Sequence, residues 1–205
     1  MLTRILRLPF GIIVSPLCRF LVARNVSPNT ITFLGALASC LAAIFTFPFN
    51  HLEWGTWLVT FFVLFDMVDG TMARMGSKGP TAWGAFLDSS LDRVSDGTLL
   101  ITLAIYADKY AHPLLPVILV ALLAGSLVSY LRARAEGLGM ECKGGLAERT
   151  DRLITALVAT GFAGLGVPYI FAVGMWLLAI ASLITVIQRV VIIYRQASTI
   201  PLQTK

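Results

Sequence analysis

The chain has few charged residues and few of the residue types that build metal or disulfide sites in soluble proteins. Only 13% of its 205 residues are charged, whereas 57% are hydrophobic and the mean hydropathy is +0.82. This composition excludes a water-soluble globular domain. Its three cysteines, Cys18, Cys40 and Cys142, are widely spaced and match no metal-ligand pattern. The two histidines, His51 and His112, are far in sequence from any acidic cluster, and we interpret them as loop residues.

Long apolar runs dominate the chain instead. They predict an all-α, polytopic membrane protein with six transmembrane helices, because roughly 20 apolar residues cross a bilayer core of about 30 Å. The runs cover residues 28–48, 54–73, 84–107, 113–133, 151–167 and 168–194, and the fifth is short.

The first 25 residues have a different pattern, in which apolar residues recur among Arg4, Arg7, Arg19 and Arg24. This pattern predicts an N-terminal interfacial amphipathic helix over residues 1–25, and it lacks a signal peptide's small-residue cleavage site. The sequence has no low-complexity linker and no internal repeat. We therefore expect residues 1–205 to form a single membrane-embedded domain with a six-helix core at 28–194.

The basic residues predict the orientation of these helices. If six spans are correct, only Lys109 of the sixteen Lys and Arg residues falls in a loop on the opposite side from both termini. The positive-inside rule then predicts a plasma-membrane protein whose termini face the cytoplasm. The net charge of +5 follows from this topology and from contact with anionic lipid, so no nucleic-acid partner is expected.

Two pairs of aspartates interrupt the apolar pattern at the predicted cytoplasmic boundary. Asp66 and Asp69 end one run, with a spacing of i, i+3. Asp88 and Asp92 begin the next, with a spacing of i, i+4, so on helices each pair shares one face. A carboxylate near the bilayer centre costs about 2.5–3.5 kcal/mol, and nearby basic residues are few. We therefore expect oxygen-ligated divalent cations here, two Mg²⁺ ions with Mn²⁺ as the alternative.

Phosphate chemistry fits such a cation site. Octahedral Mg²⁺ commonly bridges phosphate oxygens, and an aspartate of the set would accept the proton of an attacking hydroxyl. Gly70 and Ala73 keep one helical face small, so that a nucleotide can approach the backbone closely. Arg74 would then pair with a phosphate.

The stretch from Asp66 to Asp92 resembles the signature of the CDP-alcohol phosphotransferases. It reads DxxDGxxAR followed by GxxxDxxxD, with nine residues between Arg74 and Gly84 where the family more often has eight. The resemblance implies a six-helix membrane enzyme, usually a homodimer, in which an acceptor hydroxyl displaces CMP from a CDP-linked lipid. It also implies that all four aspartates bind metal and that Asp92 is the catalytic base. The CDP-lipid contacts that it implies are Asn29, Thr32, Asp69, Gly70, Ala73, Arg74, Thr81 and Gly84.

Arginines at the cytoplasmic ends of later spans indicate the acceptor. A guanidinium can bind phosphate through paired hydrogen bonds, although positive-inside anchoring explains any single arginine equally well. The segments around these arginines resemble those of the bacterial phosphatidylinositol phosphate synthases. The resemblance implies CDP-diacylglycerol and inositol 1-phosphate as substrates, and acceptor-phosphate contacts from Ser129, Arg132, Arg152 and Arg189. The family pattern has lysine at the position of Arg132, so the charge is kept while the hydrogen-bonding geometry changes.

The remaining charged residues receive structural interpretations. Asp96 lies outside the signature, and a hydrogen bond or an ion pair with Arg93 is favoured over a metal contact. Glu136, Glu148 and Asp151 are expected to balance nearby arginines.

Two other functions stay open at this point. The first is the same chemistry with glycerol 3-phosphate as acceptor, because arginines that bind a phosphate do not distinguish a sugar ring from glycerol. The second is a cation or proton transporter, because intramembrane acids often mark ion pathways. A transporter would spread its acids across the bilayer, whereas these cluster at one face.

Overall fold

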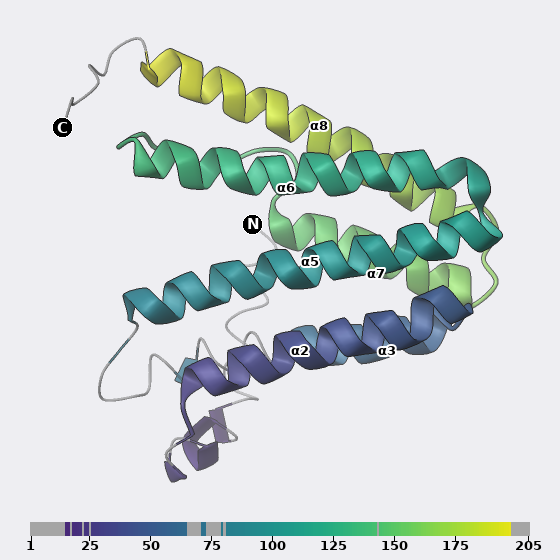
Figure 1. Cartoon of the computed structure of the whole chain (residues 1–205), viewed down its shortest axis with the longest axis horizontal. Helices are drawn as coiled ribbons and strands as arrows, with labels where there is room; N and C mark the ends of the chain where they lie inside the picture. The colour runs from purple at the N-terminus through teal and green to yellow at the C-terminus, as the bar shows by residue number, and fades with distance from the viewer. Residues whose placement is uncertain are drawn as a thin grey trace. The chain divides into compact units, whose positions relative to one another are not determined.

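A computed structural model of the chain describes residues 15–16, 18–21, 23–24, 26–64, 71–72, 79, 81–142 and 144–197. The regular structure of these residues is helical throughout, as the sequence predicts (Figure 1). The elements are α2 (Pro28–Thr46), η1 (Phe47–Phe49), α3 (Leu52–Val63), α5 (Ala82–Tyr110), η2 (His112–Leu114), α6 (Leu115–Gly137), α7 (Arg149–Gly164) and α8 (Ile170–Ala197). The chain forms two compact units, Met1–Thr102 and Leu103–Lys205, and α5 runs from the first into the second.

Five of the six predicted apolar runs overlap these helices over most of their length, whereas the run at 54–73 overlaps α3 only as far as Val63 and continues into a stretch of which only residues 64, 71 and 72 are described. Within the described residues, three helical stretches are long and apolar enough to cross a membrane: Pro28–Phe49, His112–Gly137 and Ile170–Ala197. The α5 helix has 29 residues, but the charged residues of its first half lower its hydropathy. The α7 helix has only 16 residues, as expected for the fifth run. The six-span topology and the single domain over 1–205 therefore stay predictions.

In the first unit, α2 and α3 form a tight antiparallel pair (Figure 1). The chain reverses at Phe47–Phe49 and at Asn50, whose φ of 64° is left-handed. Phe47 is fully buried beneath Gly55 of α3, where any side chain would overlap the Phe47 ring. This close approach positions α2 against α3.

The start of the first unit is partly described. Residues 15–16, 18–21 and 23 are helical, and the buried side chains of Cys18 and Met72 pack together with Leu21, Val26 and Ile31. Residues 1–14 lie outside the described residues, so the interfacial helix over residues 1–25 also stays a prediction.

In the second unit, α8 packs against both α6 and α7 (Figure 1). Small residues permit this packing: Gly174 of α8 meets Ala159 of α7 so closely that a side chain at 174 would overlap Ala159. Contacts of this kind are typical of helices packed in membranes. At the end of α5, the ring of Tyr106 meets Phe171 of α8 edge to face, with centroids 5.3 Å apart.

The α8 helix buries several polar residues and exposes many large apolar ones. Ser182, Thr185 and Arg189 are buried, while large aliphatic side chains such as Ile180 and Ile187 are exposed. A water-soluble helix would show the opposite arrangement. This inversion fits a helix that faces lipid on one side and a polar site on the other.

Candidate functional site

Asp88 and Asp92 lie one turn apart on α5, so they share a face of this helix as predicted. Both carboxylates are partly exposed, and the Arg93 guanidinium lies 3.7 Å from Asp92 Oδ2. Two partly solvated carboxylates on one helical face suit a hard divalent cation. The predicted site residues of the earlier DxxDGxxAR segment lie outside the described residues. They are Asp66, Asp69, Gly70, Ala73 and Arg74.

Three of the predicted CDP-lipid contacts meet at the start of α5. Thr81 precedes the helix and caps it, because its hydroxyl accepts a hydrogen bond of 3.0 Å from the Gly84 N–H. The side chain of Asn29 reaches the same place from α2, so that a Cβ at Gly84 would lie 3.1 Å from both Asn29 Oδ1 and Thr81 Oγ1. Thr32 is buried one turn along α2, where its hydroxyl donates to the Pro28 carbonyl at 3.1 Å. The absence of a side chain at Gly84 keeps this small polar corner open.

Arg189 is the only charged residue among the buried residues that the structure describes, with 5% of its surface exposed. Its Nη1 donates to the Val128 carbonyl of α6 at 2.6 Å, and its Nε donates to the Gly144 carbonyl at 3.2 Å. Within the described residues Arg189 forms no ion pair. Backbone carbonyls accept hydrogen bonds from two of its five N–H groups. A buried cation without a carboxylate partner is costly unless an anion joins it.

Arg152 approaches the same part of α6 as Arg189, and Ser129 lies in this part of the helix. Arg152 of α7 donates from Nη1 to the Ala147 carbonyl at 3.1 Å, and its Nε would lie 3.4 Å from a Cβ at Gly125. The Ser129 hydroxyl donates to the Gly125 carbonyl at 3.4 Å. Three of the four predicted acceptor-phosphate contacts therefore lie around one turn of α6. They are Ser129 of α6, Arg152 of α7 and Arg189 of α8.

Arg132 lies further along α6 and is more exposed. Its Nε is 2.9 Å from Glu136 Oε1, in an i, i+4 ion pair whose side chains are 54% and 51% exposed. This pair confirms that Glu136 balances a nearby arginine. The charges of Arg132, Glu136 and Glu148 all act on Arg189, so both basic and acidic residues lie near this cluster.

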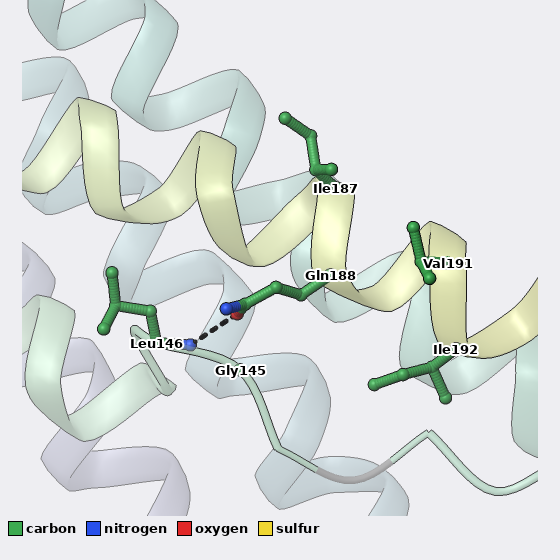
Figure 2. Close-up of a pocket in the computed structure, with 6 residues that line it drawn as sticks. All are labelled: Gly145, Leu146, Ile187, Gln188, Val191 and Ile192. Atoms are coloured by element: carbon green, nitrogen blue, oxygen red, sulfur yellow. Dashed lines mark hydrogen bonds between the residues drawn. The ribbon is translucent and has the colours of Figure 1, made fainter.

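The structure also shows a set of residues that the sequence interpretation missed. The side chains of Thr185, Gln188 and Gln196 extend from α8 and form hydrogen bonds with the backbone of the loop between α6 and α7. Figure 2 shows Gln188 reaching from α8 to the backbone nitrogen of Leu146, beside a groove of about 550 Å³. A sequence signal did exist, because these polar residues and Arg189 share one face of an otherwise apolar helix.

A family model for CDP-alcohol phosphatidyltransferases matches residues 25–187. The chain belongs to this family. The matched region contains every predicted site residue except Arg189, which lies two residues beyond its end.

Relatives of this CDP-alcohol phosphatidyltransferase are similar over most of their length. The phosphatidylinositol phosphate synthase of Streptomyces avermitilis is 40% identical over 210 aligned positions, covering 97% of this chain and 84% of the relative. That of Corynebacterium glutamicum is 40% identical over 188 positions, covering 90% and 85%.

Solved structures of the Mycobacterium tuberculosis phosphatidylinositol phosphate synthase have the same fold. The structure with CDP-DAG bound matches with a TM-score of 0.84 at 39% identity, and the match covers 89% of this chain and 94% of that one. The structure in complex with manganese and citrate matches with a TM-score of 0.83 at 39% identity, covering 88% of each chain.

Proposed function

We propose that this CDP-alcohol phosphatidyltransferase transfers the phosphatidyl group of CDP-diacylglycerol to inositol 1-phosphate, giving phosphatidylinositol phosphate and CMP. Relatives at about 40% identity are named phosphatidylinositol phosphate synthase, and the structure of one relative contains bound CDP-DAG. The observation that supports a phosphorylated acceptor most directly is Arg189, a buried guanidinium with N–H groups still available beside Ser129 and Arg152. A phosphate would supply the missing negative charge and accept paired hydrogen bonds.

The metal site of the proposed enzyme consists of Asp66, Asp69, Asp88 and Asp92, which together would hold two divalent cations. Mg²⁺ is the expected ion and Mn²⁺ the alternative, since a relative was solved with manganese. The described half of the site fits, because Asp88 and Asp92 present hard oxygen ligands from one face of α5. When bound, such ions neutralise the negative charge of a diphosphate.

The residues of this chain would supply the rest of the reaction. Asp92 takes the proton of the attacking inositol hydroxyl while a new bond forms to the phosphorus nearest the lipid and the bond to CMP breaks. Asn29 and Gly84 would contact the nucleotide, and Arg152 and Arg189 would fix the acceptor phosphate. Holding both substrates in line makes the attack effectively intramolecular.

The proposed enzyme works at a membrane surface. We assign it six transmembrane helices, an interfacial helix over residues 1–25, and an active site and both termini on the cytoplasmic side of the plasma membrane. The three apolar helices, the exposed aliphatic face of α8 and the distribution of basic residues support this topology. The family resemblance supports a homodimer.

Purified protein in detergent or liposomes, assayed for CMP release, tests the proposal. We expect release only when CDP-diacylglycerol, inositol 1-phosphate and Mg²⁺ are all present, and we expect excess EDTA to stop it. Release that does not require an acceptor would indicate a hydrolase instead. Release that requires glycerol 3-phosphate and ignores inositol 1-phosphate would retain the chemistry but refute the acceptor.

A further inference from the structure

Side chains of α8 bond the loop between α6 and α7 at several points. Gln196 bonds both backbone groups of Glu141, with distances of 3.0 Å and 2.6 Å. Gln188 Oε1 accepts from the Leu146 N–H at 2.9 Å, as Figure 2 shows. Thr185 Oγ1 accepts from the Ala147 N–H, also at 2.9 Å. The path of the loop is therefore determined by one face of α8.

Thr185 is the most enclosed residue of this set, with a fully buried side chain. Its hydroxyl donates to the Ala181 carbonyl at 2.7 Å, which aims the oxygen's lone pairs at the Ala147 N–H. Its methyl group fills the space where a side chain at Gly145 would stand, and Gly145 has a φ of +131° that favours glycine. Both ends of the Thr185 side chain therefore constrain the same stretch of loop.

The constrained stretch presents the carbonyl groups that orient two predicted acceptor-binding arginines. The Ala147 N–H donates to Thr185 Oγ1, and the Ala147 carbonyl accepts from Arg152 Nη1. Gly144, next to Gly145, accepts from Arg189 Nε. A shift of the loop would thus displace the two guanidinium groups relative to each other.

We propose that Thr185, with Gln188 beside it, is a positioning residue for the acceptor: it fixes the loop so that Arg152 and Arg189 hold the spacing that a phosphate requires. The inference rests on the proposed function, since it assigns the arginines to the acceptor phosphate. Neither Thr185 nor Gln188 is assigned a contact with the substrate. Their effect reaches the phosphate through the loop carbonyls.

Thr185→Val tests the proposal because it preserves shape and removes the hydroxyl. We expect the KM for inositol 1-phosphate to rise about tenfold, equivalent to about 1.4 kcal/mol. The kcat at saturating acceptor and the KM for CDP-diacylglycerol should each change by less than about twofold, within the range of a neutral substitution. Thr185→Ser retains the hydroxyl and should restore the acceptor KM.

The neighbouring Ser182 provides a matched control. Its hydroxyl is also fully buried in α8, but it has no hydrogen-bond partner within the part of the chain that the structure describes. Ser182→Ala should leave the acceptor KM unchanged. A Thr185→Val protein that melts earlier yet retains the wild-type acceptor KM would show that Thr185 is only structural, and equal increases in both KM values would refute the proposal as well.

A second variant covers the case in which Thr185→Val does not fold. Gln188 is exposed, so Gln188→Met should fold, and by removing the acceptor for the Leu146 N–H it should also raise the acceptor KM. Ile187→Met is its control, because Ile187 is 63% exposed and points away from the loop in Figure 2. An unchanged acceptor KM in Gln188→Met refutes the positioning role alone, whereas a wild-type protein that releases no CMP with inositol 1-phosphate refutes the proposed function.

Discussion

Replacing Arg189 with glutamine would remove the buried positive charge from the centre of the proposed acceptor site. The substitution retains a polar side chain, but a shorter one, and leaves a single amide NH2 group for the carbonyls of Val128 and Gly144, which the arginine bonds at 2.6 Å and 3.2 Å. It also removes the N–H groups that remain for an anion. We therefore expect weaker acceptor binding and a less rigid α6–α7 loop.

The size of the effect follows from the loss of charged hydrogen bonds. Each hydrogen bond to a charged group contributes about 1.5–3 kcal/mol. Losing one such interaction with phosphate raises the acceptor KM by about 10- to 150-fold, at about 1.4 kcal/mol for each factor of ten. Arg189→Lys should give a smaller increase, because the ammonium retains the charge without the planar fork.

The assay is CMP release at saturating CDP-diacylglycerol with inositol 1-phosphate varied. Arg134→Gln is the matched control, since it removes an exposed positive charge near the end of α6 that belongs to no predicted site. We expect the acceptor KM of this control variant to stay within about twofold of the wild-type value, as for most surface substitutions. An Arg189→Gln enzyme with a normal acceptor KM, or one impaired only toward CDP-diacylglycerol, would refute the assignment of Arg189 to the acceptor phosphate.

Three further predictions concern other parts of the chain. Asp92→Asn should lower kcat by at least about 10²-fold, which is the lower end of what a general base contributes. Its melting temperature, measured by scanning fluorimetry, should stay near that of the wild type. Normal turnover in this variant would show that Asp92 is not the general base. Gly84→Ala should raise the KM for CDP-diacylglycerol and leave the acceptor KM unchanged, because the added Cβ would lie 3.1 Å from Asn29 Oδ1 and Thr81 Oγ1. A raised acceptor KM with an unchanged KM for CDP-diacylglycerol would contradict the assignment of Gly84 to the CDP site. Gly174→Val should lower the melting temperature clearly, since it forces α8 away from Ala159, whereas Gly97→Ala, with no atom within 4 Å of the added Cβ, should not. Equal melting temperatures of the two variants would refute a tight α7–α8 contact.

The helices were predictable because long apolar runs constrain secondary structure locally. The run at residues 28–48 became α2 and η1, ending at Phe49, and the run at 168–194 became α8, Ile170–Ala197. The reversal at Asn50 was not predicted in detail, because it depends on how closely Gly55 lets α3 approach Phe47. Local composition gives the existence of a helix, while packing determines its ends.

The candidate site was predictable where its residues are close in sequence. Asp88 and Asp92 have a spacing that gives one helical face without any knowledge of the tertiary fold, and Arg132 and Glu136 pair by the same i, i+4 rule. Thr185 and Gln188 could not be assigned this way. Their partners, Ala147 and Leu146, are about forty residues away, at separations of 38 and 42 positions, so the contact depends on the path of the loop.

The proposed activity is the attachment of a phosphatidyl group to inositol 1-phosphate. Its most direct test is mass spectrometry of the lipid formed from CDP-diacylglycerol and Mg²⁺ when inositol 1-phosphate and glycerol 3-phosphate are present at equal concentration. We predict phosphatidylinositol phosphate as the main product, formed at least about 10²-fold more slowly by Asp92→Asn. Phosphatidylglycerophosphate as the main product, or no new phospholipid from the wild-type protein, would contradict the claim.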